Sequence, residues 1–322
     1  QAMTEIRQAT PLDIPDSDEL RFLPEGPVPL EDGVISWVAI QHGADATHGS
    51  LNILNLKSGE NRSFELPGRP GFAFPCRREN TFVVGCERSL GLFNIADGSW
   101  DPFYEGIDGG VENTIINDGM VYGHNLIFGT KDLEFATKKA SLYAYHGDEH
   151  RLVQLRDDQI CSNGKGMLRT SDGKLQLFDI DSPTRQLVAH DIEIPLGRFG
   201  APRVVIDFEG DPAVPDGAII TPDEQGIIVS MFRPEVADYG ETRLYDLITG
   251  KLKCVWQTPK SPQNTCPALV RVDGQLKLVI TTAVENMSAE AQAACPNAGR
   301  IFLADVDLHD HGEELSPRYP ID

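Results

Sequence analysis

The chain has 322 residues, of which 49 are acidic and 28 basic, so its formal net charge at pH 7 is −21. Such an acidic surface repels phosphate backbones and anionic lipid headgroups, which argues against nucleic-acid and membrane partners. No apolar run reaches the roughly 18 residues that a bilayer requires. The 40% of hydrophobic residues fit a globular protein with a full core. We expect a small-molecule partner and a monomer or a dimer.

No signal peptide is visible, and the first three residues are interpreted as a cloning remnant before a native Met. We expect a cytoplasmic protein, although a removed export signal would leave the same sequence. The cysteines form no Cys-x-x-Cys pair and no zinc spacing with histidine, so most are interpreted as buried thiols. Cys76 and Cys86 could face each other across a hairpin, which leaves one disulfide as an alternative.

Short apolar runs rich in β-branched and aromatic residues recur along the whole chain, for example at 34–40, 81–84, 126–128, 226–230 and 276–280. Asp-Gly and similar pairs separate them, and such pairs tolerate the positive φ that tight hairpins need. The only plausible helix is the short segment 288–294. The pattern indicates an all-β protein.

The predicted strands fall into six similar units of roughly 50 residues each. Each unit reads as a strand, a turn, a strand, a longer link and a closing hairpin, at 27–66, 71–104, 120–155, 165–194, 218–258 and 268–306. A four-stranded sheet repeated radially is a propeller, which leaves only short and protected edges. We therefore predict a six-bladed β-propeller with four-stranded antiparallel blades as a single domain over 23–322, preceded by an N-terminal extension at 1–22.

A polar residue followed by Gly or Asp-Gly stands just before the first strand of four units: Glu25, Asn117, Asn163 and Asp216. Each motif alone is also typical of an ordinary turn. The first strand of each propeller blade lines the central axis, so we expect these loops to converge at one mouth of the tunnel. Carboxylate and amide oxygens are the ligands of hard cations such as Ca²⁺ or Mg²⁺, and Zn²⁺ also uses them. Their repetition predicts a metal site.

The same motifs resemble the gluconolactonase, senescence-marker protein and regucalcin family of six-bladed propellers. The resemblance extends from about Leu23 to Val306. It is carried by Glu-Gly-Pro at 25–27, Asn-Asp-Gly at 117–119, Phe-Gly-Thr at 128–130, Ser-Asn-Gly at 162–164, the segment 171–179, Pro-Asp-Gly at 215–217 and the segment 296–302. It implies a metal-dependent hydrolase that opens the ring of a sugar lactone or related small lactone. One divalent cation would lie in the central tunnel, Ca²⁺ first, with Zn²⁺, Mg²⁺ and Mn²⁺ as alternatives.

The resemblance also implies roles for single residues. Glu25, Asn163 and Asp216 would hold the metal, Asn117 would contact metal-bound water or substrate, and Glu134 would contact substrate hydroxyls. Asp216 is also the candidate general base, because one carboxylate oxygen can bind the ion while the other accepts a proton. Relatives that act on sugar lactones often carry an Arg two residues before the Asn-Asp-Gly motif. This chain has Ile115 there, so a less polar substrate is a second expectation.

Other chemistries find less support in the sequence. There is no Gly-x-Ser-x-Gly elbow and no cysteine in a recognisable catalytic context. Two further functions stay open, namely a phosphotriesterase-like metal hydrolase and a non-enzymatic calcium-binding propeller. Three histidines, His42, His48 and His124, are interpreted as loop or surface residues, and two more, His309 and His311, as solvated residues near the C-terminus.

Overall fold

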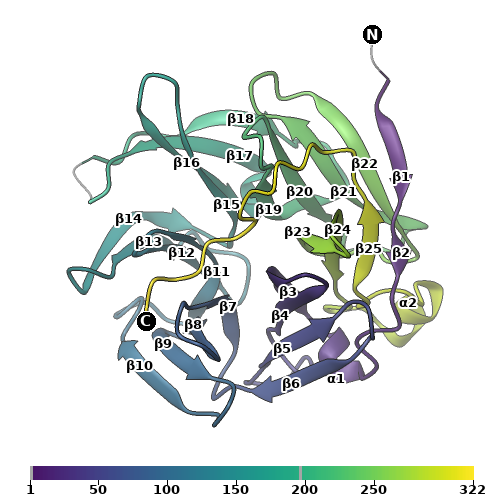
Figure 1. The fold of residues 1–322 in the computed structure, drawn as a ribbon, viewed down its shortest axis with the longest axis horizontal. Coiled ribbons are helices and arrows are strands. Elements are labelled where there is room, and N and C mark those ends of the chain that lie inside the picture. The colour runs from purple at the N-terminus through teal and green to yellow at the C-terminus, as the bar shows by residue number, and fades with distance from the viewer. Residues whose placement is uncertain (1–2, 196–197) are drawn as a thin grey trace.

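The structure is a computed structural model that describes residues 3–195 and 198–322. Its described strands form six sheets arranged around a central axis, as Figure 1 shows. Within each blade, strands that follow one another in the chain lie side by side and antiparallel, so hairpin connections suffice to build the sheet. The predicted all-β six-bladed propeller is confirmed.

The first three blades follow the chain without interruption. The first consists of β3 (Pro24–Glu31), β4 (Val34–Ala39), β5 (Ser50–Asn55) and β6 (Asn61–Glu65). The second consists of β7 (Pro70–Pro75), β8 (Thr81–Cys86), β9 (Ser89–Asn94) and β10 (Trp100–Tyr104). The third consists of β11 (Thr114–Tyr122), β12 (Asn125–Asp132), β13 (Ala140–His146) and β14 (Arg151–Gln159).

The remaining blades continue this order around the ring. The fourth consists of β15 (Ser162–Arg169), β16 (Leu175–Asp181), β17 (Gln186–Ile192) and β18 (Arg203–Asp207). The fifth consists of β19 (Val214–Ile220), β20 (Gly226–Phe232), β21 (Tyr239–Asp246) and β22 (Leu252–Pro259). The sixth takes β23 (Asn264–Val272), β24 (Gln275–Thr282) and β25 (Phe302–Asp305) from the C-terminal part of the chain.

The N-terminal segment adds an outer strand to each of the last two blades, so the fifth sheet has five strands and the sixth has four. β1 (Glu5–Gln8) pairs in parallel with β22, and β2 (Thr10–Pro11) pairs antiparallel with β25 as the outer strand of the sixth blade. The residues expected to form an extension therefore join the propeller itself. Because the two ends of the chain share one sheet, the ring is closed by backbone hydrogen bonds, which include Leu12 N to Ile301 O at 2.9 Å.

The few helical segments are short. α2 (Ala289–Ala294) confirms the predicted helix, while α1 (Asp18–Arg21) and the 3-10 turn η1 (Ser182–Thr184) were not anticipated. No helix in the described ranges is both long and apolar enough to cross a membrane. In the hairpins, Gly33 and Gly274 have φ of 75° and 76°, which is the positive φ expected at these turns.

All six cysteines are free and buried, so the alternative of a Cys76–Cys86 disulfide is wrong. The two residues stand at opposite ends of the β7–β8 hairpin. Cys86 is paired with Pro70 at the far end, whereas Cys76 follows β7 directly at the turn. The other thiols are likewise covered, as the prediction of buried cysteines required.

The C-terminal tail lies across one end of the axis. It leaves β25 and passes over β19, β15 and β11 in Figure 1 before it ends beside the second blade. Residues 314–317 line a space of about 390 Å³ together with the later halves of the inner strands. Tyr319, further along the tail, is buried, and its hydroxyl donates to the carbonyl of His124 at 3.2 Å. The opposite end, where the inner strands begin, holds the candidate site.

Candidate functional site

The four predicted polar residues lie within the innermost strands of their blades rather than in loops before them. Each stands at an interruption of the register between the innermost strand and its neighbour. The interruptions fall between Glu25 and Val28 in β3, Ile116 and Gly119 in β11, Ser162 and Lys165 in β15, and Pro215 and Ala218 in β19. A bulge bends the strand and redirects a side chain. The repeated motif is therefore a repeated bulge at the axis.

The glycines beside these residues permit the inner strands to approach one another. A Cβ on Gly164 would lie 2.6 Å from the Ala218 Cβ and 2.9 Å from the Asp216 carbonyl oxygen. Gly26 instead adopts a φ of 52°, which a residue with a side chain rarely accepts. The glycine of the polar-Gly motif thus allows close packing of strands at one position and a positive φ at another.

The four side chains meet at a cavity of about 410 Å³ at the start of the inner strands. Apolar residues form much of its wall and polar groups project into it. Its lining includes Leu23, Glu25, Ile40, Asn117, Lys131, Phe135, Asn163, Val214, Asp216, Phe232 and Glu285. The predicted convergence of Glu25, Asn117, Asn163 and Asp216 is present in the structure. A mostly apolar cleft with a few convergent polar groups is typical of a small-molecule site.

Hydrogen bonds fix the two asparagines. Asn117 Nδ2 donates to Oδ1 of Asn163 at 3.0 Å and to the carbonyl of Ser162 at 2.7 Å. Asn163 Nδ2 donates to Oγ of Ser182 at 2.6 Å. Because both amide nitrogens are engaged by protein acceptors, amide oxygen lone pairs are left for a cation or a water molecule.

The carboxyl groups repel one another. Burial, followed by the nearby Asp216 and Asp118 carboxylates, raises the pKa of Glu25 well above its usual range. Burial and the Asp118 carboxylate do the same to the pKa of Asp216. Burial also raises the pKa of Asp118 to about 6. Asp118 was not predicted as part of the site, although it stands in the Asn-Asp-Gly motif.

These residues fit a hard divalent cation. The donor set consists of carboxylate and amide oxygens, which Ca²⁺ and Mg²⁺ prefer. Glu25 and Asp216 interact directly, and a cation between carboxylates would replace their repulsion by attraction. Glu25, Asn163 and Asp216 would hold the ion, as the family resemblance implies.

A buried ion pair supports the site from beneath. Lys165 Nζ lies 2.8 Å from Asp179 Oδ1 and donates to the carbonyl of Asn163 at 2.8 Å. Gln159 donates to the other oxygen of Asp179 at 2.7 Å. Both charged side chains are almost fully buried, so the pair is satisfied only by this network. It anchors the β15 bulge that carries Asn163.

Glu134, predicted to contact substrate hydroxyls, is not among the residues that line the cavity. Its side chain is exposed, and its Oε1 accepts a hydrogen bond from Asn113 at 3.0 Å. Lys131, which stands directly opposite Ile115 in the β11–β12 ladder, lines the cavity instead. Sequence reasoning missed it, although it directly follows the Phe-Gly-Thr motif. Glu285, whose pKa is raised by burial, also lines the cavity and was missed.

The fold and the cavity together define a six-bladed propeller with an acidic, oxygen-rich site on its axis. The family model described as "SMP-30/Gluconolactonase/LRE-like region" matches residues 23–284, and the chain belongs to this family.

Two curated relatives and one solved structure illustrate the similarity. The "Putative sugar lactone lactonase YvrE" of Bacillus subtilis (strain 168) is 26% identical over 296 residues, 91% of this chain and 94% of that protein. The "6-deoxy-6-sulfogluconolactonase" of Pseudomonas putida is 24% identical over 290 residues, 89% of this chain and 91% of that protein. The structure of a regucalcin from Agrobacterium tumefaciens, described as a calcium-binding protein, superposes with a TM-score of 0.81 at 20% identity. That match covers 99% of this chain and all of the other, and it shows the shared fold.

Proposed function

We propose that this protein is a metal-dependent lactonase that opens a sugar lactone or a related small lactone. The observation that carries the proposal is the convergence of Glu25, Asn163 and Asp216 from three blades on one cavity. The names of the curated relatives, both lactonases, support the same reaction. Ca²⁺ is the expected ion because every donor is an oxygen atom.

In this proposal the protein side chains divide the work of hydrolysis. A bound divalent cation would polarise the lactone carbonyl as a Lewis acid. The Asp216 carboxylate accepts a proton from the attacking water, whose oxygen forms a bond to the carbonyl carbon. The ring C–O bond then breaks, the proton passes to the departing alkoxide, and a hydroxy acid leaves. Asn117, held by its hydrogen bonds to the fourth blade, orients the water or the substrate.

The cavity also suggests how a hydroxylated lactone would be recognised. Lys131 lines it beside carboxylates, and its charge lowers the pKa values of Asp216 and Glu285 relative to burial alone. An ammonium group is a donor of strong hydrogen bonds to substrate oxygens. Lys131 therefore supplies the cationic hydrogen-bond donor that an Arg at position 115 would otherwise supply. A polyhydroxylated lactone remains the favoured substrate class.

The test is a lactone panel in a pH-indicator assay, with protein stripped of metal and then reloaded with Ca²⁺. We expect turnover of at least one lactone that depends on added Ca²⁺ and is lost in the Asp216→Asn variant. Phosphotriesters in the same panel distinguish a phosphotriesterase-like hydrolase. Bound Ca²⁺ without turnover of any lactone or ester would overturn the proposal in favour of a non-enzymatic calcium-binding propeller.

A further inference from the structure

A second cluster of potential metal ligands lies in the first blade, and none of its three members lines the axial cavity. The loop between β4 and β5 is closed by a hydrogen bond from the His42 amide to the His48 carbonyl at 3.1 Å, which places the two rings 5.0 Å apart. Glu65, at the end of β6, pairs with Ser50 at the start of β5. One ligand atom each from His42, His48 and Glu65 lies within 4.8 Å of the others.

His42 is the central member of this cluster. It lies in a loop, as one of the two predicted settings, and its side chain is only 5% exposed. Its Nε2 lies 2.8 Å from Ser50 Oγ, and Ser50 Oγ is held in turn by Asn52 Nδ2 at 3.0 Å. Its Nδ1 is buried and has no hydrogen-bond partner among the described residues. A buried polar nitrogen without a partner is costly, and a bound ion is one arrangement that would satisfy it.

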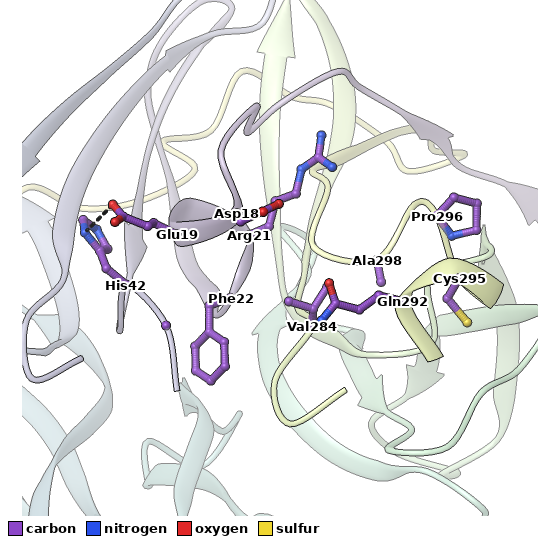
Figure 2. Close-up of a pocket in the computed structure, with 11 residues that line it drawn as sticks. Asp18, Glu19, Arg21, Phe22, His42, Val284, Gln292, Cys295, Pro296 and Ala298 are labelled. Carbon is purple, nitrogen blue, oxygen red and sulfur yellow. Dashed lines mark ion pairs between the residues drawn. The ribbon is translucent and has the colours of Figure 1, made fainter. Parts of the chain in front are cut away.

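The surroundings of the free nitrogen are those of a metal ligand. The Ser50 hydroxyl can accept from Nε2–H, which leaves the lone pair on Nδ1, and such outer-shell bonds commonly orient metal-binding histidines. Glu19 Oε2 lies 3.9 Å from Nδ1, and Figure 2 shows the two side chains pointing toward each other at one side of a pocket. Burial and the nearby His48 lower the pKa of His42 from its usual value.

We propose that His42, His48 and Glu65 form a second metal site that takes a borderline divalent ion such as Zn²⁺, with the fourth position facing Glu19. Imidazole nitrogen suits Zn²⁺, Ni²⁺ and Cu²⁺, whereas the three residues expected to hold the axial ion offer only oxygen, which suits Ca²⁺. The two sites therefore differ in the metal that they select. This inference does not depend on the proposed lactonase activity.

The location indicates what the ion would do. Glu19 belongs to α1 and His42 to the β4–β5 loop, and both line the pocket of about 380 Å³ drawn in Figure 2. Phe22 and Val284 line this pocket, while their chain neighbours Leu23 and Glu285 line the axial cavity. A bound ion would tie the loop, the outer strand β6 and α1 together beside the mouth of the propeller. The proposed site is therefore structural, because its ion would hold these three segments together beside the mouth of the propeller.

The test uses the full-length chain without an affinity tag, stripped of metal and titrated with Zn²⁺ alone and with Co²⁺ alone. We expect one Zn²⁺ bound in wild type and in the Glu25→Gln/Asp216→Asn variant, with Co²⁺ giving the visible absorption of a nitrogen-containing site in both. His48→Gln should weaken Zn²⁺ binding by more than the roughly 10–100-fold expected for Ser50→Ala, which removes only an outer-shell partner. Because His48 is exposed, we expect its substitution to leave the fold intact.

The matched control is His309→Ala/His311→Ala, which removes an exposed histidine pair whose rings lie 3.9 Å apart near the C-terminus. We expect this variant to bind Zn²⁺ as wild type does. Loss of Zn²⁺ in this control, unchanged affinity in both His48→Gln and His42→Ala, or loss of the Co²⁺ spectrum in the axial-site variant would each overturn the proposal.

Discussion

Asn117 in the third blade donates a 3.0 Å hydrogen bond from Nδ2 to Oδ1 of Asn163 in the fourth blade. The bond joins two innermost strands at their bulges and fixes the amide that is expected to bind the metal. The asparagines therefore act as a pair, although they stand 46 residues apart in the chain.

Removal of this brace should weaken metal binding. We expect Asn117→Ala to lower the affinity for Ca²⁺ by roughly 10–100-fold, the usual cost of losing a partner that orients a ligand. Isothermal titration with Ca²⁺ measures the change. The matched control is Asn113→Ala, four residues before Asn117 in the chain, which removes only an exposed hydrogen bond to Glu134. Equal Ca²⁺ affinities in the two variants would show that Asn163 needs no brace.

The stability of the metal-free protein should fall as the pH rises. The folded-state pKa values of Glu25 and Asp216 are raised by burial and by neighbouring carboxylates, and that of Asp118 to about 6. At these three groups the folded protein therefore holds more protons than the unfolded chain, and their contribution to stability is lost between about pH 4 and the raised values. Urea unfolding at pH 5 and pH 7.5 measures this loss.

Added Ca²⁺ should reduce or reverse the same pH dependence, because the ion binds the deprotonated carboxylates of the native state alone. The double variant Glu25→Gln/Asp216→Asn serves as the control, since it removes two of the three titrating groups. Its stability should vary less with pH and respond little to Ca²⁺. A metal-free wild type that loses no more stability from pH 5 to pH 7.5 than the double variant does would contradict the assigned charges.

The sequence predicted much of this arrangement, because its strongest signals are local. Hairpin pairs such as Asp32-Gly33 and Asp273-Gly274 mark turns, and their glycines have the positive φ that the turns need. Repetition of the units then predicted the blades. The closure of the ring was not predicted, since β2 is two residues long and pairs with a strand about 290 residues later.

The residues of the site likewise divide into those that a local motif predicted and those that it did not. Glu25, Asn117, Asn163 and Asp216 were found because each carries a polar-Gly motif at an equivalent position. Lys131 and Glu285 have no such motif, and only the pairing of strands and the packing of loops bring them to the cavity. The approach of Glu19 in α1 to His42 likewise joins residues that no local pattern connects.

Asp216 and Glu25 should respond differently to loss of charge. Asp216→Asn keeps an oxygen ligand of similar size but removes the proton acceptor, so kcat should fall by roughly 10²–10⁴ even at saturating metal. Glu25→Gln should act chiefly through metal affinity, so excess Ca²⁺ should restore much of its activity. Activity against Ca²⁺ concentration, with bound metal quantified, checks both. Full rescue of Asp216→Asn by metal would make Asp216 a ligand only.

The cysteines should be unreactive in the native protein. All six are buried and free, and burial raises the pKa values of Cys76 and Cys86 to about 12. Thiolates are the reactive species, so a thiol reagent at pH 8 should modify all six only after unfolding. A Ser171→Cys variant, exposed in a hairpin turn, supplies the reactive control. A melting temperature that falls on reduction would instead indicate a disulfide.

Lys131 should determine the preference for hydroxylated lactones. It lies opposite Ile115 in the ladder and lines the cavity, so its ammonium can bind substrate oxygens. We expect Lys131→Met to lower kcat/KM for a polyhydroxylated lactone. The loss should correspond to about 1.5–3 kcal/mol of transition-state stabilisation, which is what a hydrogen bond to a charged group contributes. The kcat/KM for an unsubstituted aliphatic lactone should change little. Both substrates are compared at saturating Ca²⁺, so that altered metal affinity does not enter.

Two further variants decide whether the effect belongs to the cavity. Lys139→Met removes a lysine that pairs with Asp132 in the same blade at 3.4 Å without lining the cavity, and it should leave the substrate preference unchanged. Ile115→Arg in the Lys131→Met background returns a cation from the opposite strand. It should raise kcat/KM for the polyhydroxylated lactone again, by an amount that corresponds to about 1–2 kcal/mol of transition-state stabilisation, if one charge-assisted hydrogen bond forms. If Lys131→Met weakens both substrates equally, Lys131 serves the reaction or the fold rather than recognition of hydroxyl groups.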